Sequence, residues 1–263
     1  MRKIIVAIFL VLTFLCSCSD LNNAAQLKPD EAYKPKPADA VKQKPDDSIT
    51  YSNRGIAYNK RGQYKLAIEE YNEAIRLKPD SADVYSNRGI AYAKLGQYRR
   101  AIDDYNEAIR LKPDLAESYS NRGIAYAKLD QHQRAINDYN EAIRLQPDLS
   151  EAYNNKGNAY NHLGQYQHAI DDFSKAIRLK PKDATLYYNR GIAYDNLGKL
   201  QRAIENFNEA VKLKPDDALY YTNRAGAYFM LGNKKLFCRD IQKACTLGDC
   251  KLSEMAKGKR YCP

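Results

Sequence analysis

The side chains that could support chemistry are scattered along the chain, and they form no catalytic motif. Of the three histidines, His162 and His168 are six positions apart and do not share a helical face. His132 stands where other copies of the local sequence carry tyrosine, so we interpret it as a packing residue. There is no glycine-rich phosphate loop, nucleophile elbow or metal-ligand motif. We therefore expect no enzymatic activity, no cofactor, no metal and no small-molecule substrate.

Four cysteines near the C-terminus are the strongest chemical signal, since an even number in an exported chain indicates disulfides. Cys238 and Cys245 are predicted on one helix about 10.5 Å apart, too far to be bonded to each other. We expect Cys245–Cys250 and Cys238–Cys262, and the alternative is Cys238–Cys250 with Cys245–Cys262. A zinc site is less favoured because the spacing contains no CxxC pair.

The chain repeats itself every 34 residues from residue 48 to about residue 251. A fixed period of this length indicates stacked units rather than one closed core, because each unit buries its apolar face against the next. The glycines that mark the period are Gly55, Gly89, Gly123, Gly157 and Gly191, and the prolines are Pro79, Pro113, Pro147, Pro181 and Pro215. Alanine recurs between them, and so do the aromatic residues Tyr71, Tyr105, Tyr139, Phe173 and Phe207.

This order of Gly, Tyr, Ala, aromatic, Ala and Pro resembles the tetratricopeptide repeat (TPR). The resemblance implies an all-α fold, a right-handed α-solenoid of six helix–turn–helix repeats followed by a capping helix within residues 252–263. The repeats would occupy residues 48–251, as 48–81, 82–115, 116–149, 150–183, 184–217 and 218–251.

Each repeat is predicted to form two antiparallel helices. In the second repeat the helices would cover 82–95 and 99–111, with a turn at Gly96 and a stop at Pro113. The glycine of the first helix and the alanine of the second are expected to let the two backbones approach closely. An arginine or lysine on the first helix, such as Arg88, is expected to reach a carboxylate on the following helix.

The N-terminus has the layout of a secretory signal, predicted to cover residues 1–17. Arg2 and Lys3 precede an apolar run from Ile4 to Leu15. Such a run forms about 18 Å of helix, too short for a hydrocarbon core of roughly 30 Å. We therefore expect an export signal here rather than a spanning anchor.

The sequence Leu15-Cys16-Ser17-Cys18 resembles the lipobox of bacterial lipoproteins. That resemblance implies cleavage after Ser17 and lipidation of Cys18; Cys16 fits the pattern less well, and an ordinary cleaved signal is the alternative. Residues 18–47 are rich in proline and lysine and are predicted to form a disordered tether. Lipid anchoring in the bacterial cell envelope follows, with the inner or outer membrane left open.

The resemblance to TPR proteins also implies that the first helix of each repeat lines a concave groove. An asparagine recurs on that helix, and its amide can pair with any peptide backbone. This column is similar to the asparagine ladder of TPR arrays that hold extended peptides; alternatively, the asparagines bond a neighbouring repeat. The candidate peptide-binding residues are Asn53, Asn87, Asn121, Asn155, Asn189, Asn223, Asn158, Asn161 and His162.

Some TPR proteins clamp a C-terminal carboxylate with basic residues on the groove helices. The matching places near the helix starts here carry Asp83, Glu117 and Glu151, so we do not expect that clamp. The later repeats differ most from the others in their groove residues, and we expect specificity to lie there.

These features predict a non-catalytic, exported and lipid-anchored scaffold that binds an extended peptide segment of a partner protein and assists envelope assembly or secretion. One alternative is a nucleic-acid-binding helical repeat protein, which the net charge of +10 favours and the export signal opposes. Another is a non-catalytic subunit of an enzyme complex. The predicted partner is a protein or peptide, with no nucleic acid.

Overall fold

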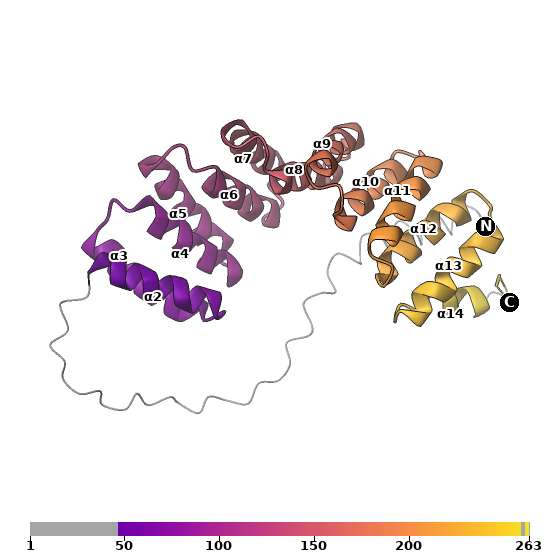
Figure 1. Ribbon diagram of the computed structural model, residues 1–263, viewed down its shortest axis with the longest axis horizontal. Coiled ribbons are helices and arrows are strands. Elements are labelled where there is room, and N and C mark those ends of the chain that lie inside the picture. Colours follow the sequence, from indigo (N-terminus) through magenta and orange to yellow (C-terminus); the bar gives the residue numbers. More distant parts are fainter. Residues whose placement is uncertain (1–46, 259–260, 263) are drawn as a thin grey trace, which may run out of the picture. The chain divides into compact units, whose positions relative to one another are not determined.

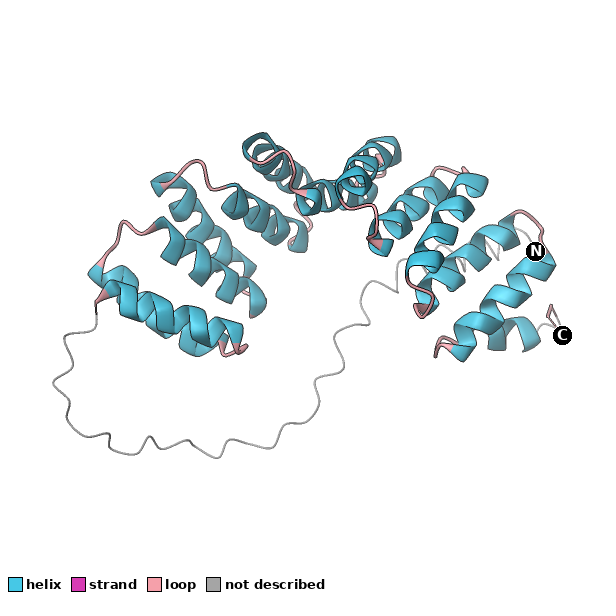
Figure 2. Cartoon of the chain, in the orientation of Figure 1, coloured by secondary structure: helices cyan, strands magenta, loops and turns pink. Residues whose placement is uncertain are grey.

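The computed structural model describes residues 47–258 and 261–262 (Figure 1). The predicted signal (1–17), the lipidation site Cys18 and all but the last residue of the predicted tether (18–47) lie outside these residues. Every regular element in the described part is a helix (Figure 2). The helices are α2 (Ser48–Lys60), α3 (Tyr64–Leu77), α4 (Ala82–Lys94), α5 (Tyr98–Leu111), α6 (Ala116–Lys128), α7 (His132–Leu145), α8 (Ser150–His162), α9 (Tyr166–Leu179), α10 (Ala184–Asn196), α11 (Leu200–Leu213), α12 (Ala218–Met230), α13 (Lys234–Thr246) and α14 (Lys251–Gly258).

Consecutive helices pack in pairs, from α2 with α3 to α12 with α13, and each pair packs on the next. The first helices of neighbouring pairs also contact one another, from α2 with α4 to α10 with α12. They form a continuous surface, which we call the first-helix face. The expected all-α stack of helix pairs is confirmed. Within the described ranges, no helix has the length and apolarity needed to cross a membrane.

The observed ends of the helices lie within one residue of the predicted ends. Helix α4 ends at Lys94, and α5 begins at Tyr98 rather than at residue 99. Gly96 has φ +73°, a left-handed conformation that favours glycine, and Gln97 N–H donates back to the Tyr92 carbonyl at 2.9 Å. This bond satisfies a backbone carbonyl that the end of α4 would otherwise leave without a partner.

The periodic aromatic residues form the centre of each pair. Tyr105 of α5 is buried, and its ring lies against Gly89 of α4. A Cβ atom at Gly89 would stand 2.7 Å from the Tyr105 Cε1 atom. The glycine therefore makes room for an aromatic ring, and not for the neighbouring backbone as the sequence suggested.

A column of basic residues joins three helices at each level. Arg88 of α4 forms a bidentate ion pair with Asp104 of α5, with distances of 2.6 and 2.8 Å. Its third nitrogen, Nη1, donates to Asn72 Oδ1 of α3 at 2.7 Å. Burial raises the pKa of the Asp104 carboxyl, although the bond from Arg88 acts in the opposite direction. The carboxylate partner was predicted, whereas the contact back to the preceding pair was not.

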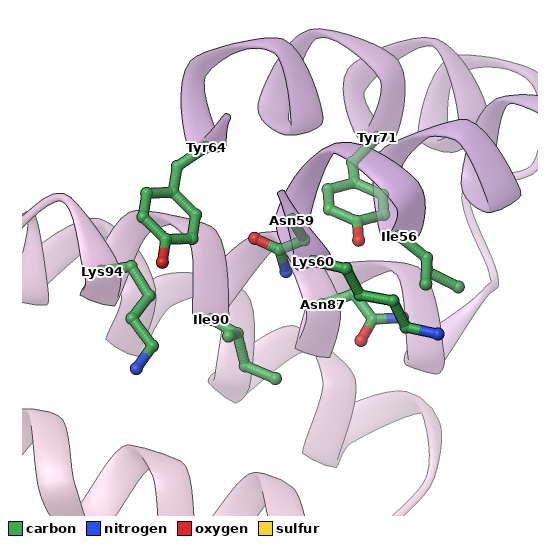
Figure 3. Close-up of a pocket in the computed structure, with 8 residues that line it drawn as sticks. All are labelled: Ile56, Asn59, Lys60, Tyr64, Tyr71, Asn87, Ile90 and Lys94. Atoms are coloured by element: carbon green, nitrogen blue, oxygen red, sulfur yellow. The ribbon is translucent and has the colours of Figure 1, made fainter. Parts of the chain in front are cut away.

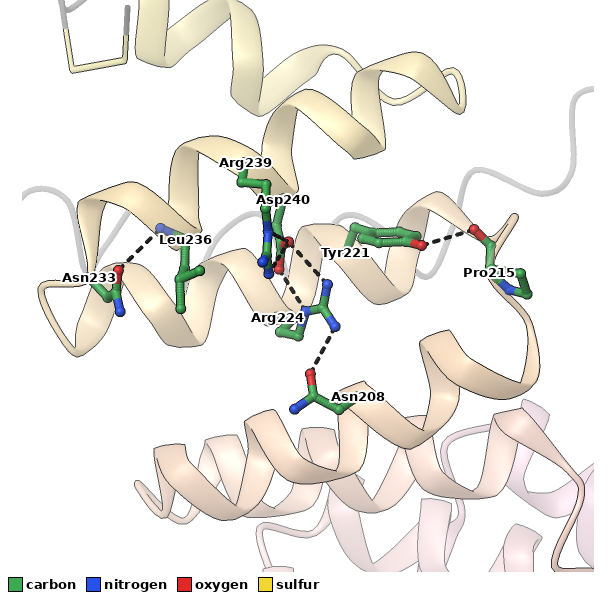
Figure 4. Close-up of polar contacts among 8 residues, drawn as sticks. All are labelled: Asn208, Pro215, Tyr221, Arg224, Asn233, Leu236, Arg239 and Asp240. Carbon is green, nitrogen blue, oxygen red and sulfur yellow. Dashed lines mark hydrogen bonds and ion pairs between the residues drawn. The ribbon is translucent and has the colours of Figure 1, made fainter.

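The same arrangement recurs along the stack, and Figure 4 shows it around Arg224. Arg224 pairs with the buried Asp240 at 2.6 Å and donates to Asn208 at 2.8 Å. From the second repeat on, each basic residue bonds its own pair and the one before, so the column fixes the register of neighbouring repeats. The other ion pairs of the column are Arg54–Glu70, Arg122–Asp138 and Lys156–Asp172; Arg190 instead bonds Asn206 and Ser174.

Helix α14 covers the last pair, and two disulfides fasten this end. Cys238 is bonded to Cys262 with their Cα atoms 5.7 Å apart, and Cys245 is bonded to Cys250. This is the first of the two pairings that the spacing allowed. Apolar side chains bury the contact between α13 and α14, namely Phe237, Ile241 and Ala256 with Leu252 and Tyr261.

Candidate functional site on the first-helix face

The predicted asparagine column lies at the edge of the buried stripe of each first helix. Asn87 shows the reason, since it stands between the buried residues Val84 and Gly89 on α4. A residue at this place turns partly toward the core and partly toward the surface. Five of the six asparagines are partly buried, and Asn53 on the first helix is exposed.

The column divides into two groups. Asn189 Nδ2 donates to Asn154 Oδ1 at 2.9 Å, and Asn223 Nδ2 donates to the Tyr188 hydroxyl at 3.0 Å. These two asparagines therefore bond the neighbouring repeat, as the alternative interpretation proposed. The amides of the other four have no hydrogen-bond partner among residues 47–258 and 261–262; they belong to Asn53, Asn87, Asn121 and Asn155.

Side-chain length explains this division. Asn189 and Asn223 each bond the residue that precedes the asparagine of the repeat before. That residue is Asn154 for Asn189 and Tyr188 for Asn223, and each of these side chains is long enough to reach the next first helix. In the first three repeats the corresponding residue is a shorter serine, which forms no bond with the asparagine of the next repeat; the serines are Ser52, Ser86 and Ser120.

The three further candidates lie in the fourth repeat and have different surroundings. Asn158 is partly exposed, and its amide has no partner among the described residues. Asn161 Oδ1 is buried without a partner. His162 stacks on His132 of α7, with ring centroids 4.7 Å apart and an angle of 5°. Burial, together with the neighbouring His162, lowers the pKa of His132, so this packing residue is neutral at pH 7.

A pocket of about 260 Å³ opens where α2, α3 and α4 meet (Figure 3). Tyr71 lines it and is 0% exposed, and its hydroxyl has no acceptor within hydrogen-bond distance. Burial raises the pKa of this hydroxyl to about 12, although the Asn59 side chain beside it acts in the opposite direction, so the hydroxyl stays protonated at neutral pH. Asn59 Oδ1 is a second buried oxygen without a partner. The other lining residues are Ile56, Lys60, Tyr64, Asn87, Ile90 and Lys94.

Sequence reasoning identified Asn87 and the apolar row of Ile56 and Ile90, but not the polar groups that complete this pocket. A signal was present in the repeat alignment, because Asn59 occupies the position of Ala93 and Ala127 in the next two copies. An amide that replaces alanine beside a buried tyrosine needs a hydrogen-bond partner. The tyrosine itself carried no signal, since the same position holds tyrosine in three copies.

In the fifth repeat, Asp195 occupies the position that Asn59 holds in the first. Its carboxylate is partly buried and has no hydrogen-bond partner in the described part of the chain, and burial raises its pKa to about 6. Within those residues, no three His, Cys, Asp or Glu side chains gather as a metal ion would require. The first-helix face thus offers amide, hydroxyl and ammonium groups, which suit recognition of a polar chain.

Solved structures with the same fold include bacterial proteins. MamA from Desulfovibrio magneticus RS-1 is 26% identical, with a TM-score of 0.61, over 65% of this chain and 96% of that chain. PilF of Pseudomonas aeruginosa is 16% identical, with a TM-score of 0.69, over 81% and 97%. YrrB, described as a TPR protein with an unusual peptide-binding site, is 22% identical, with a TM-score of 0.61, over 72% and 97%. The last two likenesses concern the fold alone.

Comparison with curated proteins gives no match. Family models match most of the repeat region: a TPR repeat model matches residues 55–96 and 91–130, and the tetratricopeptide repeat model matches 116–149, 150–183 and 184–217. The family consists generally of non-catalytic proteins that bind protein or peptide partners. Since these matches together span more than half of its residues, the chain belongs to the tetratricopeptide repeat family and is a scaffold for protein–protein interaction.

Proposed function

We propose that this chain is a non-catalytic scaffold whose first-helix face binds an extended peptide segment of a partner protein. The observation that carries the proposal is the group of four unpartnered amides on consecutive first helices, Asn53, Asn87, Asn121 and Asn155. Each amide can donate to a peptide carbonyl and accept from a peptide N–H group. A peptide that runs along the face would therefore be held by its backbone.

Backbone contacts alone give weak binding. Four hydrogen bonds at about 1 kcal/mol net each give about 4 kcal/mol, before the peptide's ordering cost. Micromolar binding requires about 8 kcal/mol. The partner segment must therefore place side chains into pockets of the face, and these contacts would give the scaffold its specificity.

The proposal includes a cellular location. We infer export to the bacterial cell envelope and lipidation at Cys18, because Leu15-Cys16-Ser17-Cys18 resembles a lipobox and four cysteines form disulfides downstream. In such a location the predicted tether would hold the repeats away from the membrane, where they could assist envelope assembly or secretion. The likeness to YrrB supports only the fold that would present the peptide.

The peptide-binding role is tested by crosslinking pull-down from bacterial envelope fractions. A variant with Asn87→Ala, Asn121→Ala and Asn155→Ala should capture markedly less partner than the unaltered chain. A matched control with Asn189→Ala and Asn223→Ala removes two asparagines that already bond the stack, and it should capture nearly as much. Equal capture by all three proteins would rule out the amide column as the binding element.

A second variant probes the column without altering it. Ser52→Asn places on the first repeat the side chain with which Asn154 bonds Asn189. The new amide should engage Asn87 and so weaken peptide capture. The reverse change, Asn154→Ser, should release Asn189 and leave capture undiminished; a loss in this variant would contradict the proposed division of the column.

Lipidation is tested by metabolic labelling with radioactive palmitate in a bacterial host. The unaltered chain should incorporate label and sediment with membranes, and Cys18→Ser should do neither. Cys16→Ser should be labelled normally. Incorporation that persists in the Cys18→Ser variant would show that this residue is not the acceptor.

A further inference from the structure

The pocket between α2, α3 and α4 combines positive charge with buried polar groups that have no partner. Lys60 and Lys94 stand at its rim, both exposed, and neither has an ion-pair partner in residues 47–258 and 261–262. Tyr71 is the one tyrosine of those residues whose hydroxyl is buried and without a partner. In Figure 3 this hydroxyl points toward the space beside Asn59 and Asn87.

Buried hydroxyl groups in folded proteins are nearly always hydrogen-bonded, so an unpartnered one in an open pocket indicates a missing acceptor. Two unpaired ammonium groups at the rim favour an acceptor that carries negative charge. Ile56 and Ile90 form the apolar part of the lining and suit the methylene groups of a side chain. A carboxylate on a short aliphatic arm meets all of these requirements.

The next junction along the stack provides an internal comparison. It has the corresponding lysines, Lys94 and Lys128, and the corresponding tyrosine, Tyr105. However, Ala93 takes the place of Asn59 and packs against the core around Tyr105. The first junction is therefore distinguished by Asn59 beside a fully buried tyrosine hydroxyl, and not by its lysines alone.

We propose that this pocket receives the side-chain carboxylate of an acidic residue in the bound peptide, which makes the first junction a specificity site. The inference rests on the proposed peptide-binding function. The Tyr71 hydroxyl donates to the carboxylate, and Lys60 and Lys94 neutralise it. Asn59 can turn its amide so that the N–H group faces the ligand. Asn87 remains free to bond the peptide backbone beside the acidic residue.

This site differs from a clamp for a chain terminus. Its cations come from the last turn of α2 and of α4, whereas Asp83, near the start of α4, adds an acidic group to that helix. The pocket therefore selects an internal acidic residue of an extended segment, with the chain continuing along Asn121 and Asn155. It also moves part of the specificity to the first repeats, whereas sequence reasoning placed it in the later ones.

The pocket can be tested without any partner protein by NMR on the full chain with 13C-labelled tyrosine rings. The Tyr71 signal is assigned by its absence in the Tyr71→Phe variant, which should fold because Phe173 and Phe207 occupy the same position in other repeats. The probes are N-acetyl-glutamate N-methylamide and its glutamine counterpart. The glutamate probe should shift the Tyr71 signal in a saturable manner, and the glutamine probe should have a much smaller effect.

Matched variants then test which lysine interacts with the carboxylate of the probe. Lys60→Ala should weaken the response to the glutamate probe about three-fold, and Lys128→Ala, at the next junction, should leave it unchanged. Equal responses to the two probes would overturn the carboxylate site. A response that does not depend on Lys60 would overturn it as well.

Selection from a displayed library of random twelve-residue peptides extends the test to the bound chain. The unaltered protein should select peptides with an acidic residue, and glutamate to glutamine exchange in a selected peptide should weaken binding about ten-fold. Tyr71→Phe should remove this preference, and Tyr105→Phe should retain it. Peptides that depend on the asparagine column but show no acidic preference would refute the pocket and leave the proposed function intact. A glutamate-specific Tyr71 shift without any captured peptide would support the pocket and contradict the proposed peptide-binding function.

Discussion

A single methyl group can test how tightly the aromatic ring of each repeat is packed. Gly89→Ala places a carbon 2.7 Å from the buried Tyr105 ring, so the ring or the helix must move. We expect a loss of about 1–3 kcal/mol in the free energy of unfolding, larger than the helix-propensity gain of about 1 kcal/mol. Urea denaturation measures this. Gly258→Ala, which meets nothing within 4 Å, is the control, and an equal change in both would contradict the packing argument.

A partly buried carboxylate without a partner should make stability depend on pH. The pKa of Asp195 in the folded chain is about 6, above the ordinary value of 3.8, so folding favours the protonated acid. Its ionised form therefore destabilises the fold above pH 6, and stability should rise as the pH falls from 7 to 4. Asp195→Asn should stabilise the chain at pH 7.5 by on the order of 2 kcal/mol, and the gain should vanish near pH 4.

Thermal unfolding of the Asp195→Asn variant at several pH values tests this prediction. The exposed Asp103 supplies a control, because Asp103→Asn should change stability little at any of them. A gain for Asp195→Asn that stays constant between pH 7.5 and pH 4 would show that the effect is not due to ionisation.

At the scale of single elements, helix ends follow from glycine and proline, with one exception in the third repeat. Asp130 takes the place that Gly96 and Gly164 hold in the neighbouring repeats, and it has φ 57°. This left-handed conformation costs a residue with a Cβ atom more than it costs glycine. Asp130→Gly should therefore stabilise the fold by about 0.5–1 kcal/mol. The matched change Gly96→Asp should destabilise it by a similar amount, and urea midpoints that move in the other direction would contradict this.

The two disulfides close loops of different length and should contribute unequally. Cys238 and Cys262 are 24 positions apart, and Cys245 and Cys250 are 5 apart. Loop-closure entropy gives about 3.5 kcal/mol for the longer loop and about 2 for the shorter one. The double change Cys238→Ser and Cys262→Ser should thus lower the unfolding temperature more than Cys245→Ser with Cys250→Ser. A greater loss from the shorter loop would contradict the entropic account.

At the scale of the whole molecule, the period of 34 residues was sufficient to predict the stack, because neighbours in the sequence are neighbours in space. The division of the asparagine column was not predicted. It depends on whether Asn154 or Tyr188 reaches across to the next first helix, which is a matter of distance between repeats. The backward bond from Arg88 to Asn72 and the unpartnered Tyr71 hydroxyl were likewise set by packing between pairs, which periodicity alone does not describe.

A stack held together by contacts between adjacent pairs should open first at the pair that buries fewest residues. Helix α2 buries only Gly55, whereas α9 buries six of its residues, and α14 with its disulfide covers the opposite end. Hydrogen exchange followed by mass spectrometry should therefore show faster exchange in α2 and α3 than in α6 to α9. Reduction of the disulfides should accelerate exchange in α13 and α14 and leave α6 to α9 unchanged, because their contacts lie within the interior pairs. Equal protection of all helices would instead indicate one cooperative unit, in which the first pocket could not respond separately from the rest of the stack.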